Sequence, residues 1–268
     1  MPDIDSTARV ADGAILADDV VIGPFCLVGA DVTLEAGVRL RSHVNVEGST
    51  TIGARTQVYP FASLGGAPQS VHYKGEPTRL VIGADCVIRE HATANIGTAG
   101  GRGVTRIGNH CMLMVNAHVG HDCLVGDHVI FANNAVLGGH VDVGDHVFLG
   151  GQSAVHQFVR IGAQAMIAGV TGVREDVIPF GYALGQAARL VGLNTVGMKR
   201  RGFSRSDLHQ ARAAYRDLFF GADVFEERLA RLRAEAQQSM FARLIVDFID
   251  GGSNRPLCQP SRGVAPRD

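Results

Sequence analysis

The sequence predicts a parallel β-helix built from hexapeptide repeats, followed by a small α-helical C-terminal domain. Large apolar residues recur at every sixth position from Val10 to Leu64, and the same register resumes at Ile107 and runs to Val173. A period of six fits neither an amphipathic helix, which repeats every 3.6 residues, nor a plain strand, which repeats every two. Glycine commonly follows the apolar residue, and a small or apolar residue stands four positions after it.

Each hexapeptide supplies one short strand and one corner, so three of them close a triangular coil. Neighbouring coils stack at the strand spacing of about 4.8 Å and pair their backbones. The apolar residue and the small residue four positions later are predicted to point inward, because the prism axis is too narrow for two large side chains per repeat. Glycine at the corner is expected to supply the backbone freedom that a sharp turn requires.

Composition agrees with a long, thin core. The chain of 268 residues contains 34 glycines, no tryptophan and only 6% aromatic residues. Its formal net charge of -1 argues against a nucleic-acid-binding surface. The sequence has no apolar run of transmembrane length and no signal peptide pattern, so we predict no transmembrane segment and a cytoplasmic location.

The cysteines fit the same repeat. Four of the five stand four residues after an apolar repeat position, where small inward-facing residues are predicted. They are interpreted as buried core residues, neither a zinc cluster nor a disulfide framework, because free cysteine is among the most buried residue types. These four are Cys26, Cys86, Cys111 and Cys123.

The prism is predicted to span residues 1–190, with external loops near 65–81 and 95–106. The first loop keeps the repeat phase, but continuing the repeat through it would bury Ser70 and Glu76 without partners, which is costly. The second loop shifts the register by one residue. Its glycine-rich sequence predicts a flexible segment.

Residues 191–268 are predicted to form a helical C-terminal domain. Ser204 and Asp207 resemble a capping box, and apolar residues follow at helical spacing. Further helices are expected at about 223–236 and 238–250, and a disordered tail from Gly251. A prism with a helical appendage leaves broad flat faces, which favour self-association.

Polar residues gather on one outer part of the prism. Within the stretch 116–123, His121 and Asp122 are predicted to lie on an outer face because Val119 and Cys123 point inward. One coil later, Gly139 and His140 stack on them. The predicted cluster is His118, His121, Asp122, Gly139, His140, His156 and Gln157.

A second histidine column, formed by His110, His128 and His146, also recurs every 18 residues. Because each of these histidines lies in a turn sequence, we interpret them as exposed corner residues without a function. The first cluster is mixed in residue type, and mixed titratable groups beside apolar neighbours are typical of functional sites.

Three classes of protein remain open at this point. A γ-class carbonic anhydrase would hold zinc with three histidines across a subunit interface. However, it needs a histidine pair five residues apart, and His118 and His121 are three apart. A purely structural solenoid leaves the polar loop and the basic helix start without a role. The third class is an acyltransferase that uses a histidine base and no metal.

Six further motifs make a family resemblance specific. The combination resembles the UDP-N-acetylglucosamine acyltransferases of lipid A biosynthesis and covers nearly the whole chain. The N-acyltransferase that acts later in the same pathway is less similar, because it carries a uridine-binding domain before its repeats. The motifs are PQSVHYKGEPTR (68–79), IRE (88–90), NAHVGHDC (116–123), LGGHV (137–141), AVHQF (154–158) and MKRRGFS (198–204).

The resemblance implies properties that spacing alone does not predict. Parallel crossovers are normally right-handed, whereas this family implies a left-handed β-helix. It also implies a homotrimer that transfers a 3-hydroxyacyl chain from acyl carrier protein to the sugar 3-position of UDP-N-acetylglucosamine. That reaction is the first step of lipid A biosynthesis and needs neither a cofactor nor a metal.

Matching the family motifs residue by residue implies individual roles. His121 corresponds to the general base, Asp122 to the carboxylate that orients it, and the backbone N–H of Gly139 to the oxyanion donor. Gly169 corresponds to the position that limits acyl-chain length. Substrate contacts are implied for Gln69, Ser70, His72, His118, His140, His156 and Gln157 and, toward the nucleotide, for Asn194, Arg200 and Arg201. The basic stretch between residues 199 and 216 suits the acidic surface of acyl carrier protein.

The chain departs from the family pattern at four positions. Ser70 replaces a common Asp, His72 a Lys, Asn95 a His, and Val196 a Glu. Because some members acylate a 3-amino analogue of the sugar nucleotide, the loss of the carboxylate at Ser70 keeps N-acylation open as an alternative. O-acylation is the favoured interpretation.

Overall fold

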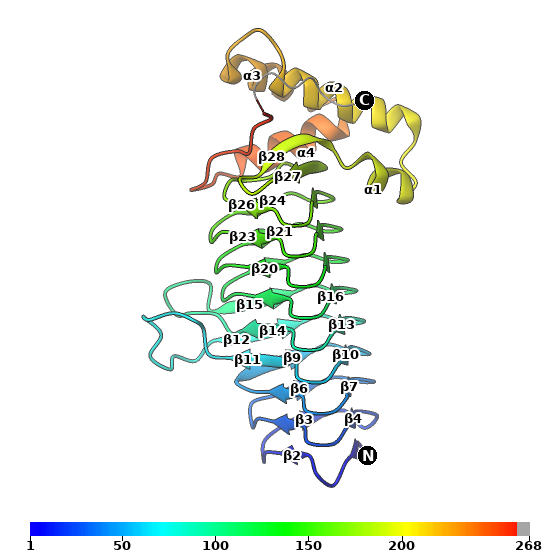
Figure 1. The fold of residues 1–268 in the computed structure, drawn as a ribbon, viewed down its shortest axis with the longest axis vertical. Helices are drawn as coiled ribbons and strands as arrows, with labels where there is room; N and C mark the ends of the chain where they lie inside the picture. The colour runs from blue at the N-terminus through cyan, green and yellow to red at the C-terminus, as the bar shows by residue number, and fades with distance from the viewer. Residues whose placement is uncertain (262–268) are drawn as a thin grey trace.

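The computed structural model describes residues 1–261, which form a triangular prism of stacked coils with a helical domain at its C-terminal end (Figure 1). Three sheets, here called A, B and C, make the three faces. This confirms the predicted left-handed parallel β-helix with a small helical C-terminal part.

Sheet A has 11 strands and includes both strands that end the prism. They are β1 (Asp3–Ile4), β4 (Val21–Ile22), β7 (Arg39–Leu40), β10 (Gln57–Val58), β13 (Val87–Ile88), β16 (Met112–Leu113), β19 (Ile130–Phe131), β22 (Phe148–Leu149), β25 (Met166–Ile167), β27 (Gly181–Leu184) and β28 (Arg189–Leu193).

Sheets B and C have 9 and 8 strands. Sheet B contains β2 (Arg9–Val10), β5 (Leu27–Val28), β8 (Asn45–Val46), β11 (Ser63–Gly66), β14 (Thr93–Asn95), β17 (His118–Val119), β20 (Val136–Leu137), β23 (Ala154–Val155) and β26 (Gly172–Val173). Sheet C contains β3 (Ile15–Leu16), β6 (Thr33–Leu34), β9 (Ser49–Ile52), β12 (Arg79–Ile82), β15 (Val104–Ile107), β18 (Leu124–Val125), β21 (Asp142–Val143) and β24 (Arg160–Ile161).

The strand register follows the 18-residue coil. Val21 of β4 pairs in parallel with Arg39 of β7, and Ile130 of β19 pairs with Phe148 of β22. The two external loops lengthen two coils but leave the stack continuous, because the strands on either side of each loop keep parallel partners, with one register shift between β11 and β14. Only the final pair, β27 with β28, is antiparallel among the paired strands of the described chain.

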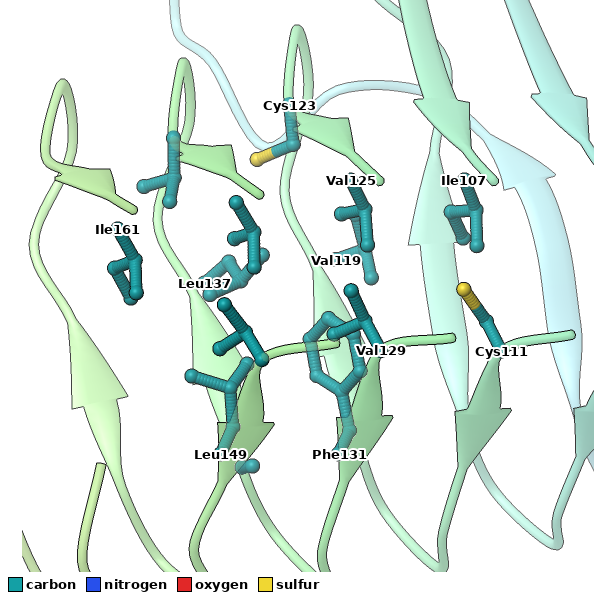
Figure 2. Close-up of a cluster of buried hydrophobic side chains, with 14 of the residues drawn as sticks. Ile107, Cys111, Val119, Cys123, Val125, Val129, Phe131, Leu137, Leu149 and Ile161 are labelled. Atoms are coloured by element: carbon teal, nitrogen blue, oxygen red, sulfur yellow. The ribbon is translucent and has the colours of Figure 1, made fainter. Parts of the chain in front are cut away.

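The repeat residues fill the prism axis as predicted (Figure 2). Every sixth residue from Ile22 to Leu64 and from Ile107 to Val173 is at most 4% exposed. The four predicted core cysteines are free and buried, and Cys258 is as well. The core is therefore one continuous apolar column along the prism axis, filled by the inward-facing residues of the strands.

The corners correct the predicted role of glycine. The non-glycine residues with positive φ, between 55° and 66°, stand three places after the apolar position, such as His43, His128 and Asn134, whereas among the glycines directly after it only Gly65 has positive φ. Gly53 has no such φ. A Cβ on Gly53 would lie 2.5 Å from the carbonyl carbon of Gly83 in the next coil. Glycine therefore permits the close stacking of coils at this position.

The helical domain contains α1 (Thr195–Arg200), α2 (Arg205–Phe219), α3 (Phe225–Glu235) and α4 (Met240–Asp250). Ser204 and Asp207 form the predicted capping box at the start of α2. Phe180 at the end of the prism packs against Phe203 and Phe241, with ring centroids 5.9 and 5.2 Å away. Aromatic packing thus attaches the helices to the last coil.

The predicted disordered tail is wrong for residues 251–261. This segment runs back along the prism, where Leu257 bridges to Asp176 and Pro260 bridges to Leu190, and the Cys258 side chain is fully buried. Backbone pairing and burial of an apolar side chain hold it in place. Residues 262–268 lie outside the described part of the chain.

A search of residues 1–261 finds no helix long and apolar enough to cross a membrane.

Close stacking predicts the effect of a small substitution. Gly53→Ala should destabilise the fold by about 1–3 kcal/mol, because its methyl group meets backbone atoms of the next coil that cannot move independently. Gly100→Ala is the control, since Gly100 has open space around it and an ordinary φ. Thermal unfolding at fixed protein concentration compares the two variants. Equal melting temperatures would contradict the stacking argument.

Candidate active site

The corner between sheets B and C carries the predicted polar cluster. His121 and Asp122 lie between β17 and β18, and the backbone N–H of His140 donates to the His121 carbonyl at 2.9 Å, which confirms the predicted stacking. One coil further, the backbone N–H of Phe158 donates to the Gly139 carbonyl. Three successive coils therefore present their corner residues on one edge.

His121 and Asp122 form a hydrogen-bonded pair. Nδ1 of His121 lies 2.8 Å from Oδ2 of Asp122. The imidazole is 18% exposed, whereas the carboxyl group is completely buried. An ionised carboxylate only accepts hydrogen bonds, so Nδ1 is the donor and the lone pair of Nε2 is free. This tautomer is the one that a general base requires.

Asp122 is buried because the loop between β14 and β15 folds over it. The Thr98 hydroxyl donates to Oδ2 at 2.7 Å, and the Arg102 backbone N–H donates to Oδ1 at 2.7 Å. Burial alone would raise the pKa of Asp122, but the hydrogen bonds from Thr98, His121 and Arg102 outweigh it and hold the pKa below its usual value. The carboxylate is therefore ionised, and the loop predicted as flexible is tied to the site.

Gly139 lies against the imidazole of His121. A Cβ at this position would be 2.6 Å from both Cε1 and Nε2 of His121. Only glycine leaves room for the ring. The backbone N–H of Gly139 has no acceptor among the described residues, so it is available beside Nε2.

Two further histidines surround the pair. The His140 ring contacts His121 edge-on at a centroid distance of 5.0 Å and stacks on Phe158 at 4.6 Å. Nδ1 of His118 lies 2.8 Å from the Thr93 hydroxyl. Burial lowers the pKa of both His118 and His140. Both rings are therefore neutral hydrogen-bonding groups near pH 7.

His156 and Gln157 also reach this corner, where the C-terminal segment contacts them. Arg255 donates to Nδ1 of His156 at 2.8 Å and to the Gln157 carbonyl at 3.1 Å. Because arginine can only donate, Nδ1 of His156 is the acceptor and its proton is on Nε2. Sequence reasoning missed Arg255, since its segment was predicted to be disordered.

The loop with Gln69, Ser70 and His72 leaves the prism at the same corner, between β11 and β12 (Figure 1). Gln69 and His72 are exposed, and the half-buried Ser70 hydroxyl accepts a hydrogen bond from the His72 backbone N–H at 3.3 Å. Asn95 donates to the carbonyl of Ala67 and fixes the base of the loop. These side chains lie two coils from His121 along the same edge.

The donor set does not suit a metal ion. Ligand atoms of His121, Asp122 and His140 lie within 4.8 Å of one another. However, a carboxylate offers about four lone-pair positions, and Asp122 already accepts hydrogen bonds from Thr98, Arg102 and His121. A metal would have to displace this network, which disfavours the carbonic anhydrase interpretation.

The predicted nucleotide-binding residues lie elsewhere, on the outer face of sheet A. A cavity of about 1020 Å³ lies between this face and the helical domain. Its floor is apolar, formed by Met112, Ile130, Phe148 and Met166. Its polar lining includes Asn194, Arg200, Arg201, His209, Arg212 and Arg216.

The second histidine column lies at its predicted corner, with His110 and His128 exposed and His146 half-buried. His110, His128 and His146 line this cavity and stack at centroid distances of 4.7 and 4.6 Å. Burial, followed by the nearby His128 and Arg201, lowers the pKa of His146. Their 18-residue spacing was visible in the sequence. What the sequence could not reveal is that the helical domain folds over this corner.

Asn194 has a structural role within the cavity wall. Its side-chain oxygen accepts from the Gly197 backbone N–H and caps α1, while its amide nitrogen donates to the Gln164 carbonyl. Nε of Arg201 donates to the Gln164 side chain at 2.7 Å. Asn194 therefore orients the short helix that ends with Arg200.

The predicted chain-length residue occupies a third position. Gly169 is exposed at the corner between sheets A and B, between β25 and β26. In a triangular prism, the B/C corner with His121 is opposite face A. One chain therefore does not bring the base, the arginines and Gly169 together.

A hexapeptide β-helix with a histidine hydrogen-bonded to a buried carboxylate on an outer corner, beside an open glycine N–H, has the features of a bacterial hexapeptide transferase. Residues 105–139 match the family described as bacterial transferase hexapeptide (six repeats), and residues 176–258 match that of UDP N-acetylglucosamine O-acyltransferase, domain 2.

Whole-chain comparisons are more specific. The chain is 74% identical over 265 residues to the acyl-(acyl-carrier-protein)-UDP-N-acetylglucosamine O-acyltransferase of Azorhizobium caulinodans, covering 99% of this chain and 98% of that relative. The crystal structure of the Moraxella catarrhalis UDP-N-acetylglucosamine O-acyltransferase superposes with a TM-score of 0.92 at 41% identity, covering 96% of this chain and 99% of that one. The Francisella novicida enzyme gives 0.94 at 34% identity, covering 97% and 95%. The chain belongs to the UDP-N-acetylglucosamine O-acyltransferase family.

The contact between Gly139 and His121 predicts a local effect on activity. Gly139→Ala should lower kcat by about 100-fold, because its methyl group displaces the His121 ring by roughly an ångström. Gly151→Ala is the control, since the nearest atom to a Cβ there is 3.4 Å away. Steady-state kinetics of acyl transfer give kcat for the two variants, and circular dichroism checks that both are folded. Near-normal turnover of the Gly139 variant would exclude this contact from catalysis.

Proposed function

We propose that the protein transfers a 3-hydroxyacyl chain from acyl carrier protein to the 3-hydroxyl group of UDP-N-acetylglucosamine, the first step of lipid A biosynthesis. The observation that carries the proposal is the His121–Asp122 pair with the free N–H of Gly139 beside it. The printed names of the relatives support the substrates. A cytoplasmic location stays a prediction.

The chemistry follows from the tautomer of His121. Nε2 removes the proton from the sugar 3-hydroxyl as that oxygen attacks the thioester carbonyl. Asp122 stabilises the imidazolium that forms, and the Gly139 N–H donates to the oxyanion of the tetrahedral intermediate. When the intermediate collapses, the C–S bond breaks and the thiolate of the carrier receives the proton from Nε2.

We infer that each site is shared between two chains of a trimer. The B/C corner with His121 and the cavity on face A lie on opposite sides of one prism, so a second chain must bring its face A to the first chain's corner. Corner-to-face contact is heterologous, and three such contacts close into a ring. The half-exposed Met112, Ile130, Phe148 and Met166 on face A suit burial in this interface.

In this arrangement the arginines hold the nucleotide. Arg200 and Arg201 line the cavity with exposed guanidinium groups, and guanidinium binds phosphate oxygens in a bidentate manner. Arg205, Arg212 and Arg216 continue the positive surface along α2, where the acidic carrier protein would dock.

The acceptor is proposed to be the 3-hydroxyl sugar. Ser70 carries no charge and already accepts a hydrogen bond from His72 within the loop, so this position does not select an amine. The relatives compared above are named O-acyltransferases. No feature of residues 1–261 selects the 3-amino analogue.

Gly169 is proposed to limit acyl-chain length from the neighbouring subunit. It lies at the edge of face A, next to Met166, and its exposed surface leaves a chain free to pass. A bulky side chain there would block the channel, so the site with Gly169 suits a long donor.

The base assignment is tested by His121→Ala. We expect kcat to fall by about 10²–10⁴-fold with the trimer intact, since the ring lies outside the core. The assay incubates the purified protein with 3-hydroxyacyl carrier protein and UDP-N-acetylglucosamine and follows the acylated nucleotide by mass spectrometry. Wild-type protein that forms no product would sink the proposed function, and an active variant would sink the role of His121.

A further inference from the structure

The loop of residues 97–103 encloses the carboxyl group of Asp122. It leaves the coil after β14, and two of its residues donate three hydrogen-bonding groups to one carboxylate: the Thr98 N–H and hydroxyl and the Arg102 N–H. At Gly101 the backbone passes so close that a Cβ would lie 2.5 Å from the carboxyl carbon.

The Arg102 side chain fastens the loop at its far end. Nη1 donates to the backbone carbonyl of Asp122 at 2.8 Å, and the guanidinium forms a bidentate pair with Asp142 at 2.6 and 2.9 Å. Asp142 is on the outer face of sheet C, in the coil above Asp122. The loop thus connects two coils across the catalytic corner.

We propose that Thr98 and Arg102 are positioning residues that control the basicity and the orientation of His121 through Asp122. The inference rests on His121 acting as the base proposed above. A carboxylate that accepts several hydrogen bonds has less charge to offer to an imidazolium, so the donors of the loop weaken the stabilisation that Asp122 gives to protonated His121. It also fixes the carboxylate plane, and with it the imidazole.

The direction of the effect follows from the hydrogen bonds. Removing the Thr98 hydroxyl leaves Oδ2 of Asp122 with His121 and the longer Thr98 N–H contact at 3.1 Å as its donors, which stabilises the imidazolium form of His121. Activity on the acid side would then be lost at a higher pH. Other groups facing His121 are His118 and His140, with Arg102 and Asp142 behind them.

Thr98→Val is the direct test. We expect kcat to fall about tenfold with KM nearly unchanged, and the acid limb of the kcat/KM profile to move up by about half a pH unit or more. Thr98→Ser keeps the hydroxyl and should restore the wild-type limb. Thr51→Val is the matched control, a substitution on the outer face of sheet C away from the loop.

Asp142→Asn tests the anchor without touching Asp122. Because Arg102 and Asp142 are about a third exposed, the pair is partly screened, and the fall in kcat should be smaller than in Thr98→Val. Repeating the Thr98→Val profile in a His140→Gln background separates His121 from the neighbouring imidazole.

Two outcomes would overturn the inference. The first is a Thr98→Val enzyme whose acid limb stays at the wild-type pH while only its melting temperature or the height of its kcat/KM profile falls. That result would mean that the loop has only a structural role. The second is a Thr98→Ser enzyme that behaves like the valine variant. Neither result affects the proposed function, which depends on whether the wild-type protein forms the acylated nucleotide.

Discussion

Parallel stacking of coils at one strand spacing is the constraint on which the other features depend. An apolar residue and a small residue from each repeat fill the axis, so each corner residue lies directly above its counterpart one coil earlier, which is 18 residues away outside the two coils that carry the loops. The register places Gly139 on the His121 ring and the His128 ring on His110. The catalytic geometry is thus a consequence of core packing rather than of a separate local motif.

Because the stacked coils fix the corner residues at the surface, the external loops are needed to shield them from water. A prism corner exposes its side chains to water, and an exposed aspartate would be a weak and mobile partner for histidine. The loop over Asp122 removes that carboxylate from solvent and replaces water with fixed donors from Thr98 and Arg102. Burying a charge is costly unless it is fully hydrogen-bonded, and here every lone-pair position has a donor. The prism supplies the position, and the loop supplies the electrostatic environment.

Much of this arrangement could be predicted from period and spacing, and the failures have physical causes. The inward column, the stacked His121 cluster and the capping box at Ser204 follow from local repeats or short-range capping. The contacts of Thr98 and Arg255 join segments 24 and 99 residues apart, to which no periodicity applies. The sequence predicts that glycine after the apolar position relieves strain in the turn, but close stacking of coils requires glycine at the same six-residue spacing. Only the φ angles of the structure distinguish these two explanations.

The central claim is that the base and the nucleotide-binding arginines of one site come from different chains. Subunit complementation tests it most directly. His121→Ala and Arg201→Ala chains, each of low activity alone, would be co-expressed with different affinity tags and the mixed trimers purified. In a heterologous ring, every trimer that contains both kinds of chain has both residues intact at one of its three sites, so activity should return to roughly a third of wild type. Mixed trimers no more active than either parent would contradict a shared site.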